Sequence, residues 1–172
     1  PAGGTASTQF VQAPVFALPF NMASGAVVKV TNHVAITSGA MPPDPDITVT
    51  LSAGGTTFMT LTNAVYDGGS GTLSWSGALT NDVALGVGEA VTCEIGSSES
   101  GVGFRVLYDS DAAPSRIVLP TSTIIALPSL AVYDAAYPAG LPVAEPAVGQ
   151  TVFIRTTVTD PFGAYDITGV EL

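Results

Sequence analysis

The stretch DITVTLSAGGTTFMTL, residues 46–61, decides the fold class of this chain. From Ile47 to Leu51 every second residue is apolar and the residues between are threonine, which is the period of two that a half-buried strand shows. Gly54 and Gly55 follow, and glycine adopts the positive φ angles that a two-residue hairpin turn requires. A second run of β-forming residues comes directly after them. The stretch therefore predicts two antiparallel strands joined by a tight turn.

The same period recurs along the chain at spacings of about ten to fifteen residues, with glycine and proline between the segments. The further strands are expected at residues 26–37, 71–79, 90–95, 102–109, 116–120 and 122–127. Because no helical periodicity separates these segments, the strands have no crossover helices and must pair antiparallel. We therefore predict an all-β, jelly-roll-like sandwich of about eight strands over residues 1–128.

A second module is expected over residues 129–172. Pro128 is expected to end the preceding strand, and new strands are predicted at SLAVYD (129–134) and TVFIRTTVTD (151–160). A turn at DPFG is followed by DITGVEL, which opens one more strand. Three strands leave an exposed sheet face and open edges, so this module is expected to need a cover.

The segment TVFIRTTVTDPFGAYDITGVEL (151–172), with SLAVYDAAYPAG (129–140) ahead of it, resembles the immunoglobulin-like β-sandwich repeats of large bacterial secreted and surface proteins. The resemblance covers about the last quarter of the chain. It implies an extracellular setting and an incomplete immunoglobulin-like module, and it implies no catalytic activity.

Composition limits the classes of function. Charged residues make up 10% of the 172 residues, against about 25% in average domains, and the net charge is −10. A phosphate backbone would be repelled by this charge, so no nucleic-acid partner is expected. No apolar run reaches the roughly 20 residues that cross a bilayer, so no membrane insertion is expected. The threonine-, glycine- and alanine-rich, lysine-poor composition is typical of secreted or cell-surface proteins of bacteria and archaea.

Groups that could act in catalysis are few. The single cysteine, Cys93, shares a strand face with apolar neighbours and is expected to be a buried, inert thiol. The single histidine, His33, lies on the predicted solvent face of residues 26–37, and no G-x-S-x-G nucleophile motif occurs. Trp75 shares its face with leucines, which favours a core position over a sugar-stacking platform. We therefore expect the protein not to be an enzyme.

Carboxylate pairs are the remaining chemical signal, because Ca²⁺ binds oxygen ligands from loop carboxylates and carbonyls. Asp109 and Asp111 follow a strand directly and are the candidate calcium ligands. The alternative is that these aspartates, like the pairs at 44/46 and 160/166, start turns by hydrogen bonding to their own backbone.

The segment 26–37 also contains two polar residues whose positions bear on its structure and chemistry. Lys29, the only lysine, points outward by the alternation, which disfavours an isopeptide crosslink in the core. Asn32 interrupts the apolar face of the same segment and is read as the mark of a β-bulge.

These features favour a non-catalytic structural or adhesive module of a bacterial or archaeal surface protein. Such a module would be a fibre or surface-layer subunit that assembles with other copies of itself, or with neighbouring modules, through β-strand contacts. The segment TASTQFVQAPVFALPF (5–20) is the expected strand donor; the alternative is that the 172 residues are part of a longer protein. The competing function is a carbohydrate-binding module with a polysaccharide partner.

Overall fold

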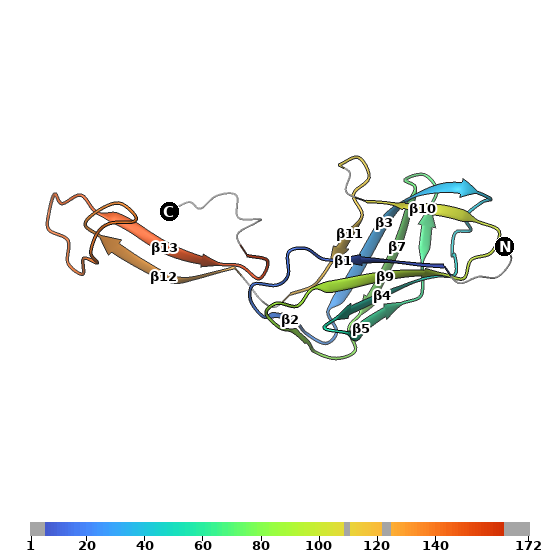
Figure 1. Cartoon of the computed structure of the whole chain (residues 1–172), viewed down its shortest axis with the longest axis horizontal. Helices are drawn as coiled ribbons and strands as arrows, with labels where there is room; N and C mark the ends of the chain where they lie inside the picture. The colour runs from blue at the N-terminus through green and yellow to red at the C-terminus, as the bar shows by residue number, and fades with distance from the viewer. Residues whose placement is uncertain (1–5, 109–110, 122–124, 164–172) are drawn as a thin grey trace.

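The computed structural model describes residues 6–108, 111–121 and 125–163, and within these ranges the chain contains strands and no helix (Figure 1). The strands in chain order are β1 (Ala6–Val11), β2 (Phe20–Met22), β3 (Val27–Ser38), β4 (Ile47–Ala53), β5 (Thr56–Leu61), β6 (Val65–Asp67), β7 (Thr72–Ala78), β8 (Val83–Leu85), β9 (Val91–Ser97), β10 (Gly103–Leu107), β11 (Arg116–Val118), β12 (Ala126–Tyr133) and β13 (Phe153–Thr159). The predicted all-β class is confirmed.

Two antiparallel sheets form a sandwich. One sheet has the strand order β1-β9-β4-β5, and the other has the order β10-β3-β7-β6 with β11 also paired to β3. β2 and β8 form a small separate ladder. The predicted sandwich is confirmed, although eleven strands rather than eight precede β12. The additional strands include β2, β6 and β8, which are three residues long and therefore too short to show a period of two.

The core consists of the strand faces that the alternation of apolar and polar residues predicts to be buried. Val28 and Val30 on β3 are fully buried, and so are the alternate residues Ile47, Val49 and Leu51 of β4. β4 pairs with β5 through a two-residue turn in which Gly54 and Gly55 have φ values of 56° and 80°. The hairpin that the stretch 46–61 predicts is therefore confirmed.

Asn32 lies on the buried face of β3, but it does not mark a bulge there. The register between β3 and β7 runs without a break from Val27 opposite Ala78 to His33 opposite Thr72. The irregularity of this sheet lies instead between Gly103 and Phe104, where β10 pairs with β3. The bulge prediction was wrong because a single buried polar residue fits an unbroken strand.

β1 belongs to the sandwich of its own chain. Its residues Ala6–Val11 pair with β9, in register from Ala6 opposite Ser97 to Val11 opposite Thr92. Further along, Phe16 and Phe20 are buried in the core. The expectation that the segment 5–20 is a free strand donor is therefore wrong for these residues.

β12 and β13 form a separate two-stranded sheet that projects from one end of the sandwich (Figure 1); we call it the hairpin sheet. β12 runs through Pro128, with an irregular register between Ala126 and Ser129, so the strand end expected at Pro128 was wrong. The division of the chain into modules at 128/129 stays a prediction. The strand expected at 166–172 lies outside the described residues.

An arginine holds the loop that connects the two strands of the hairpin sheet. The Arg155 guanidinium lies 3.8 Å from the centre of the Tyr133 ring and donates a hydrogen bond to the carbonyl oxygen of Ala135 at 2.9 Å. It also contacts the carbonyl oxygen of Ala139. These contacts cover one face of the hairpin sheet, because Tyr133 and Arg155 lie on the same face.

An aromatic cluster joins the hairpin sheet to the sandwich. The ring of Phe162 lies 5.5 Å from that of Phe16 and 5.6 Å from that of Phe20. The N–H of Ala17 donates to the carbonyl oxygen of Pro161 at 2.7 Å. The segment after β13 is thus anchored to two buried rings, Phe16 and Phe20, of which Phe20 is the first residue of β2.

Candidate functional site

The calcium candidates are not brought together with other ligands in the described structure. Asp111 is exposed, and Asp109 lies outside the described residues. Within residues 6–108, 111–121 and 125–163 no group of three or more His, Cys, Asp or Glu side chains converges. Calcium binding at Asp109 and Asp111 stays a prediction.

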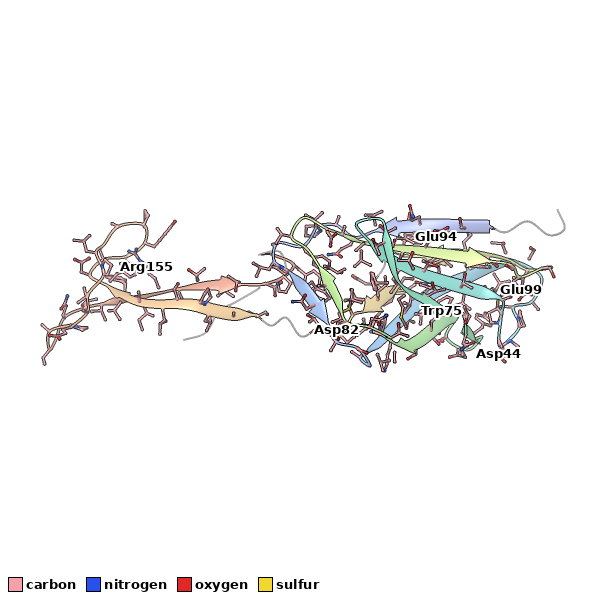
Figure 2. All side chains as sticks on the ribbon, turned by 90° about the horizontal axis from the view of Figure 1, so that it is seen from below. Asp44, Trp75, Asp82, Glu94, Glu99 and Arg155 are labelled. Carbon is pink, nitrogen blue, oxygen red and sulfur yellow. The ribbon has the colours of Figure 1, made fainter. Side chains whose placement is uncertain are left out.

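Several other carboxylates lie at opposite ends of the sandwich or support turns. Figure 2 shows Asp82 at the end next to the hairpin sheet and Asp44 with Glu99 at the far end. Asp82 Oδ1 accepts a hydrogen bond from the N–H of Ser24 at 2.7 Å. Asp160 is buried and its Oδ1 accepts from the N–H of Phe162 at 2.7 Å, as the turn interpretation of the aspartates expects.

Turn hydrogen bonds also account for the one shifted carboxyl pKa of the described residues. The hydroxyl of Ser70, followed by the backbone N–H of Gly69, lowers the pKa of Asp67 because both donate to its ionised form. This carboxylate is fully exposed and belongs to the β6–β7 turn, so it stabilises a turn and is no candidate for acid–base chemistry.

The residues that might have carried catalysis or sugar stacking are placed as predicted. Cys93 is buried, and burial raises the pKa of its thiol to about 11, so the thiolate is scarce at neutral pH. Trp75 is buried and its indole Nε1–H donates to the carbonyl oxygen of Ile47 at 3.0 Å, which links the two sheets. His33 and Lys29 occupy the outer face of β3.

A large hollow of the sandwich runs along one open side. It is a groove of about 850 Å³ between β1, the edge strand of one sheet, and β10, the edge strand of the other. Consecutive residues line it on both sides, Ala6–Phe10 of β1 and Gly103–Val106 of β10. Because successive side chains of a strand point to opposite faces, a consecutive lining means that the strand edges themselves face the hollow. We call this the edge groove.

Two smaller hollows continue the edge groove along the same side. A cavity of about 140 Å³ is reached past Phe10 and Tyr108, whose rings meet edge to face with 5.2 Å between their centres. A further hollow of about 590 Å³ shares Phe10, Cys93 and Ile117 with that cavity and ends at Phe162. The open side of the sandwich is therefore hollow from the far end of β1 to the junction with the hairpin sheet.

The 140 Å³ cavity contains an unpartnered polar group. Asn32 lines it, is 6% exposed, and has a buried Nδ2 with no hydrogen-bond partner. A buried donor without a partner costs about 1–3 kcal/mol, so native structures rarely retain one unless something else uses it. The sequence signalled this residue, since it is the polar interruption of an apolar strand face, but not its place in a cavity.

The charges along the open side are mixed with a cationic excess. Arg105 and Glu99 line the edge groove, and Arg116 lines the 140 Å³ cavity. These two arginines are half of the four basic residues of a chain whose net charge is −10. Among the described residues, two of the three charged side chains that line the hollows of the open side are thus basic, which suits an acidic segment.

The hairpin sheet is the second candidate contact surface, because apolar side chains are exposed on it. Leu130 on β12 is 67% exposed and Ile154 on β13 is 52% exposed, and the two lie on the face opposite to Arg155. Ile125 and Leu127, at the start of β12, are also exposed. Apolar side chains gathered on one face of a two-stranded sheet form a contact surface rather than scattered single exposures.

No family model, no curated protein and no solved structure matches this chain. Among the described residues there is also no helix with the length and hydropathy needed to traverse a bilayer. The fold and the two surfaces therefore carry the functional interpretation.

Proposed function

We propose that this chain is a non-catalytic structural or adhesive module of an extracellular surface protein, and that copies or neighbouring modules associate through β-strand contacts. The observation that carries the proposal is the exposed apolar face of the hairpin sheet, formed by Leu130 and Ile154 with Leu127 beside them.

A two-stranded sheet is marginally stable in water unless its apolar face is packed against something. Arg155, Tyr133 and the connecting loop cover one face of the hairpin sheet, and the aromatic cluster anchors only its base. The remaining apolar face buries its area when another β-module docks on it. Burial of apolar area at about 25 cal/mol per Å² is the main favourable contribution to such association.

The extracellular setting is supported by the sequence. Charged residues are 10% of the chain, lysine occurs once, and residues 129–172 resemble immunoglobulin-like repeats of bacterial surface proteins. We propose that these residues form part of such an immunoglobulin-like module. The inert, buried Cys93 and the core position of Trp75 agree with a role in packing rather than in catalysis or sugar stacking.

Light scattering coupled to size-exclusion chromatography tests the proposal. We expect the 172-residue chain to show a mass that rises with concentration. The double substitution Leu130→Thr and Ile154→Thr keeps β-forming residues but removes apolar surface, and it should abolish the rise. Val87→Thr, at an equally exposed apolar position on the sandwich, is the matched control and should leave association unchanged. A folded wild-type monomer at the highest attainable concentration would defeat the proposal.

A further inference from the structure

We propose that the edge groove is the acceptor for the hairpin sheet of a second copy of this chain, with β12 added as a strand beside β1. This inference rests on the proposed function and names the two surfaces that meet. Copies joined in this way are arranged head to tail, because the groove and the hairpin sheet are different surfaces of one chain.

The backbone of β1 is free to accept a strand. The N–H of Gln12 bonds to the carbonyl oxygen of Val91, so the alternation of an antiparallel pair turns the backbone groups of Phe10 and Thr8 toward β9. The backbone groups of Ser7 and Gln9 then face the groove, and those of Val11 face the adjoining hollow of about 590 Å³. A row of outward N–H and C=O groups is the template on which β-strand addition occurs.

The backbone of β10 meets the groove in the same way. The N–H of Val34 bonds to Gly71, on the side of β3 away from β10, so Ala35 is the β3 residue that exchanges bonds with Arg105. The backbone groups of Phe104 and Val106 consequently point outward. An extended segment lying between β1 and β10 finds free backbone partners on either side, which a globular ligand would not use.

β12 has the length and edge that this groove requires. The N–H of Val143 bonds to the carbonyl oxygen of Val132, which closes one end of the outer edge of β12. The open part, residues 126–131, is as long as β1 with its six residues. Pro128 has no N–H, so at that position the open edge of β12 offers only a carbonyl oxygen to β1. The exposed apolar side chains of β12, Leu127 at 61% and Leu130 at 67%, are more exposed than Phe153 at 37% and Ile154 at 52% on β13.

The apolar surfaces and charges of the two sites are complementary. Leu127 and Leu130 of β12 and Ile125, which directly precedes the strand, are each 60–67% exposed. The open side offers the apolar walls Phe10, Phe104 and Val106. The loop after β12, residues 134–150, carries Asp134 and Glu145 and no basic residue. Its two carboxylates suit an open side that carries Arg105 and Arg116.

Asn32 lies behind the proposed contact. Its Nδ2 is itself buried in the cavity that adjoins the groove, so it cannot donate to a strand placed beside β1. Asn32→Leu should therefore stabilise the isolated fold and leave association unchanged, which separates the effect of the cavity from that of the groove.

A mixing experiment tests the pairing of the two surfaces. Gln9→Pro removes an outward N–H of β1 without removing a bond to β9, so it blocks the groove and preserves the fold. The double substitution Leu127→Thr and Leu130→Thr blocks the hairpin sheet. Each variant alone should stay monomeric, because each retains one functional surface. An equimolar mixture should form a 1:1 dimer and nothing longer, measured by sedimentation velocity with circular dichroism as the check on folding.

Every other outcome overturns the inference. If Gln9→Pro associates like the wild type while the hairpin variant does not, the hairpin sheet pairs with its own kind, and the proposed function survives without the groove. If a polysaccharide retards the wild type but not Gln9→Pro in affinity electrophoresis, and association is unaffected, the groove is a glycan site. If the wild type is monomeric throughout, the inference and the proposed function fail together.

Discussion

Replacing Asn32 with leucine should stabilise this protein, although the change removes a polar residue that could hydrogen-bond. Asn32 is 6% exposed, sits between Val30 and Val34 on the buried face of β3, and has no partner for Nδ2. Leaving such a donor unpaired costs about 1–3 kcal/mol, and an apolar side chain of similar shape avoids that cost. We expect the free energy of unfolding to rise by about 1–2 kcal/mol and Tm to rise by roughly 3–8 °C.

Urea denaturation followed by tryptophan fluorescence measures this effect directly. Trp75 is the only tryptophan, and its indole is buried between the sheets, so its emission reports the loss of the sandwich core. Asn63→Leu, at an exposed position, is the matched control and should change stability by no more than about 0.5 kcal/mol. Asn32→Asp should be destabilising at neutral pH, because it buries a carboxylate without a partner.

A decrease of more than about 1 kcal/mol in the free energy of unfolding of Asn32→Leu would refute the reasoning, because a decrease of that size is what the deletion of a satisfied hydrogen bond costs. The amide would then have an acceptor inside the isolated chain.

Three further predictions concern the backbone, the thiol and calcium. Gly39→Ala should lower the free energy of unfolding by more than Gly25→Ala does. Both glycines have positive φ, but only at Gly39 would a Cβ collide with a backbone oxygen of the β9–β10 loop. Equal losses of stability in urea denaturation would contradict this. Burial raises the pKa of the Cys93 thiol from 9.0 to about 11 in the folded protein, so the contribution of this thiol to stability is complete below pH 9 and is lost between pH 9 and 11. The free energy of unfolding should therefore fall less in Cys93→Ala than in the wild type over that window. Parallel pH profiles of the two proteins would contradict this. Calcium at Asp109 and Asp111 should raise Tm by several degrees at saturating Ca²⁺, and EGTA should reverse the rise; a Tm that ignores both reagents removes the site.

The strands with a long alternating pattern could be predicted from the sequence, together with their buried faces. β3, β4, β7 and β9 each extend over seven residues or more, which is enough for several repeats of the period. The turn at Gly54-Gly55 could be predicted because few residues other than glycine adopt its φ angles. The class, the sandwich and the pairing of β4 with β5 follow from these local signals.

β1 could not be predicted in the same way, because five of its six residues are exposed and its apolar residues show no period of two. Its strand conformation depends on pairing with β9. The strand end predicted at Pro128 was wrong for a related reason. Proline disfavours strand interiors in general, but an edge position needs no N–H there, and only the sheet topology shows that β12 is an edge.

By itself the sequence determined the fold class, the face that each long strand buries, the inertness of Cys93 and the core position of Trp75. It also singled out Asn32 as a polar residue on an apolar face. The tertiary structure decided what that residue adjoins, since the cavity around it is built from β1, β3, β9, β10 and β11, which are distant along the chain. Whether a strand edge is paired or free depends on which strands become neighbours, and the periodicity of the side chains does not indicate which strands these are. The edge groove and the exposed face of the hairpin sheet therefore emerge only when the sheets are assembled.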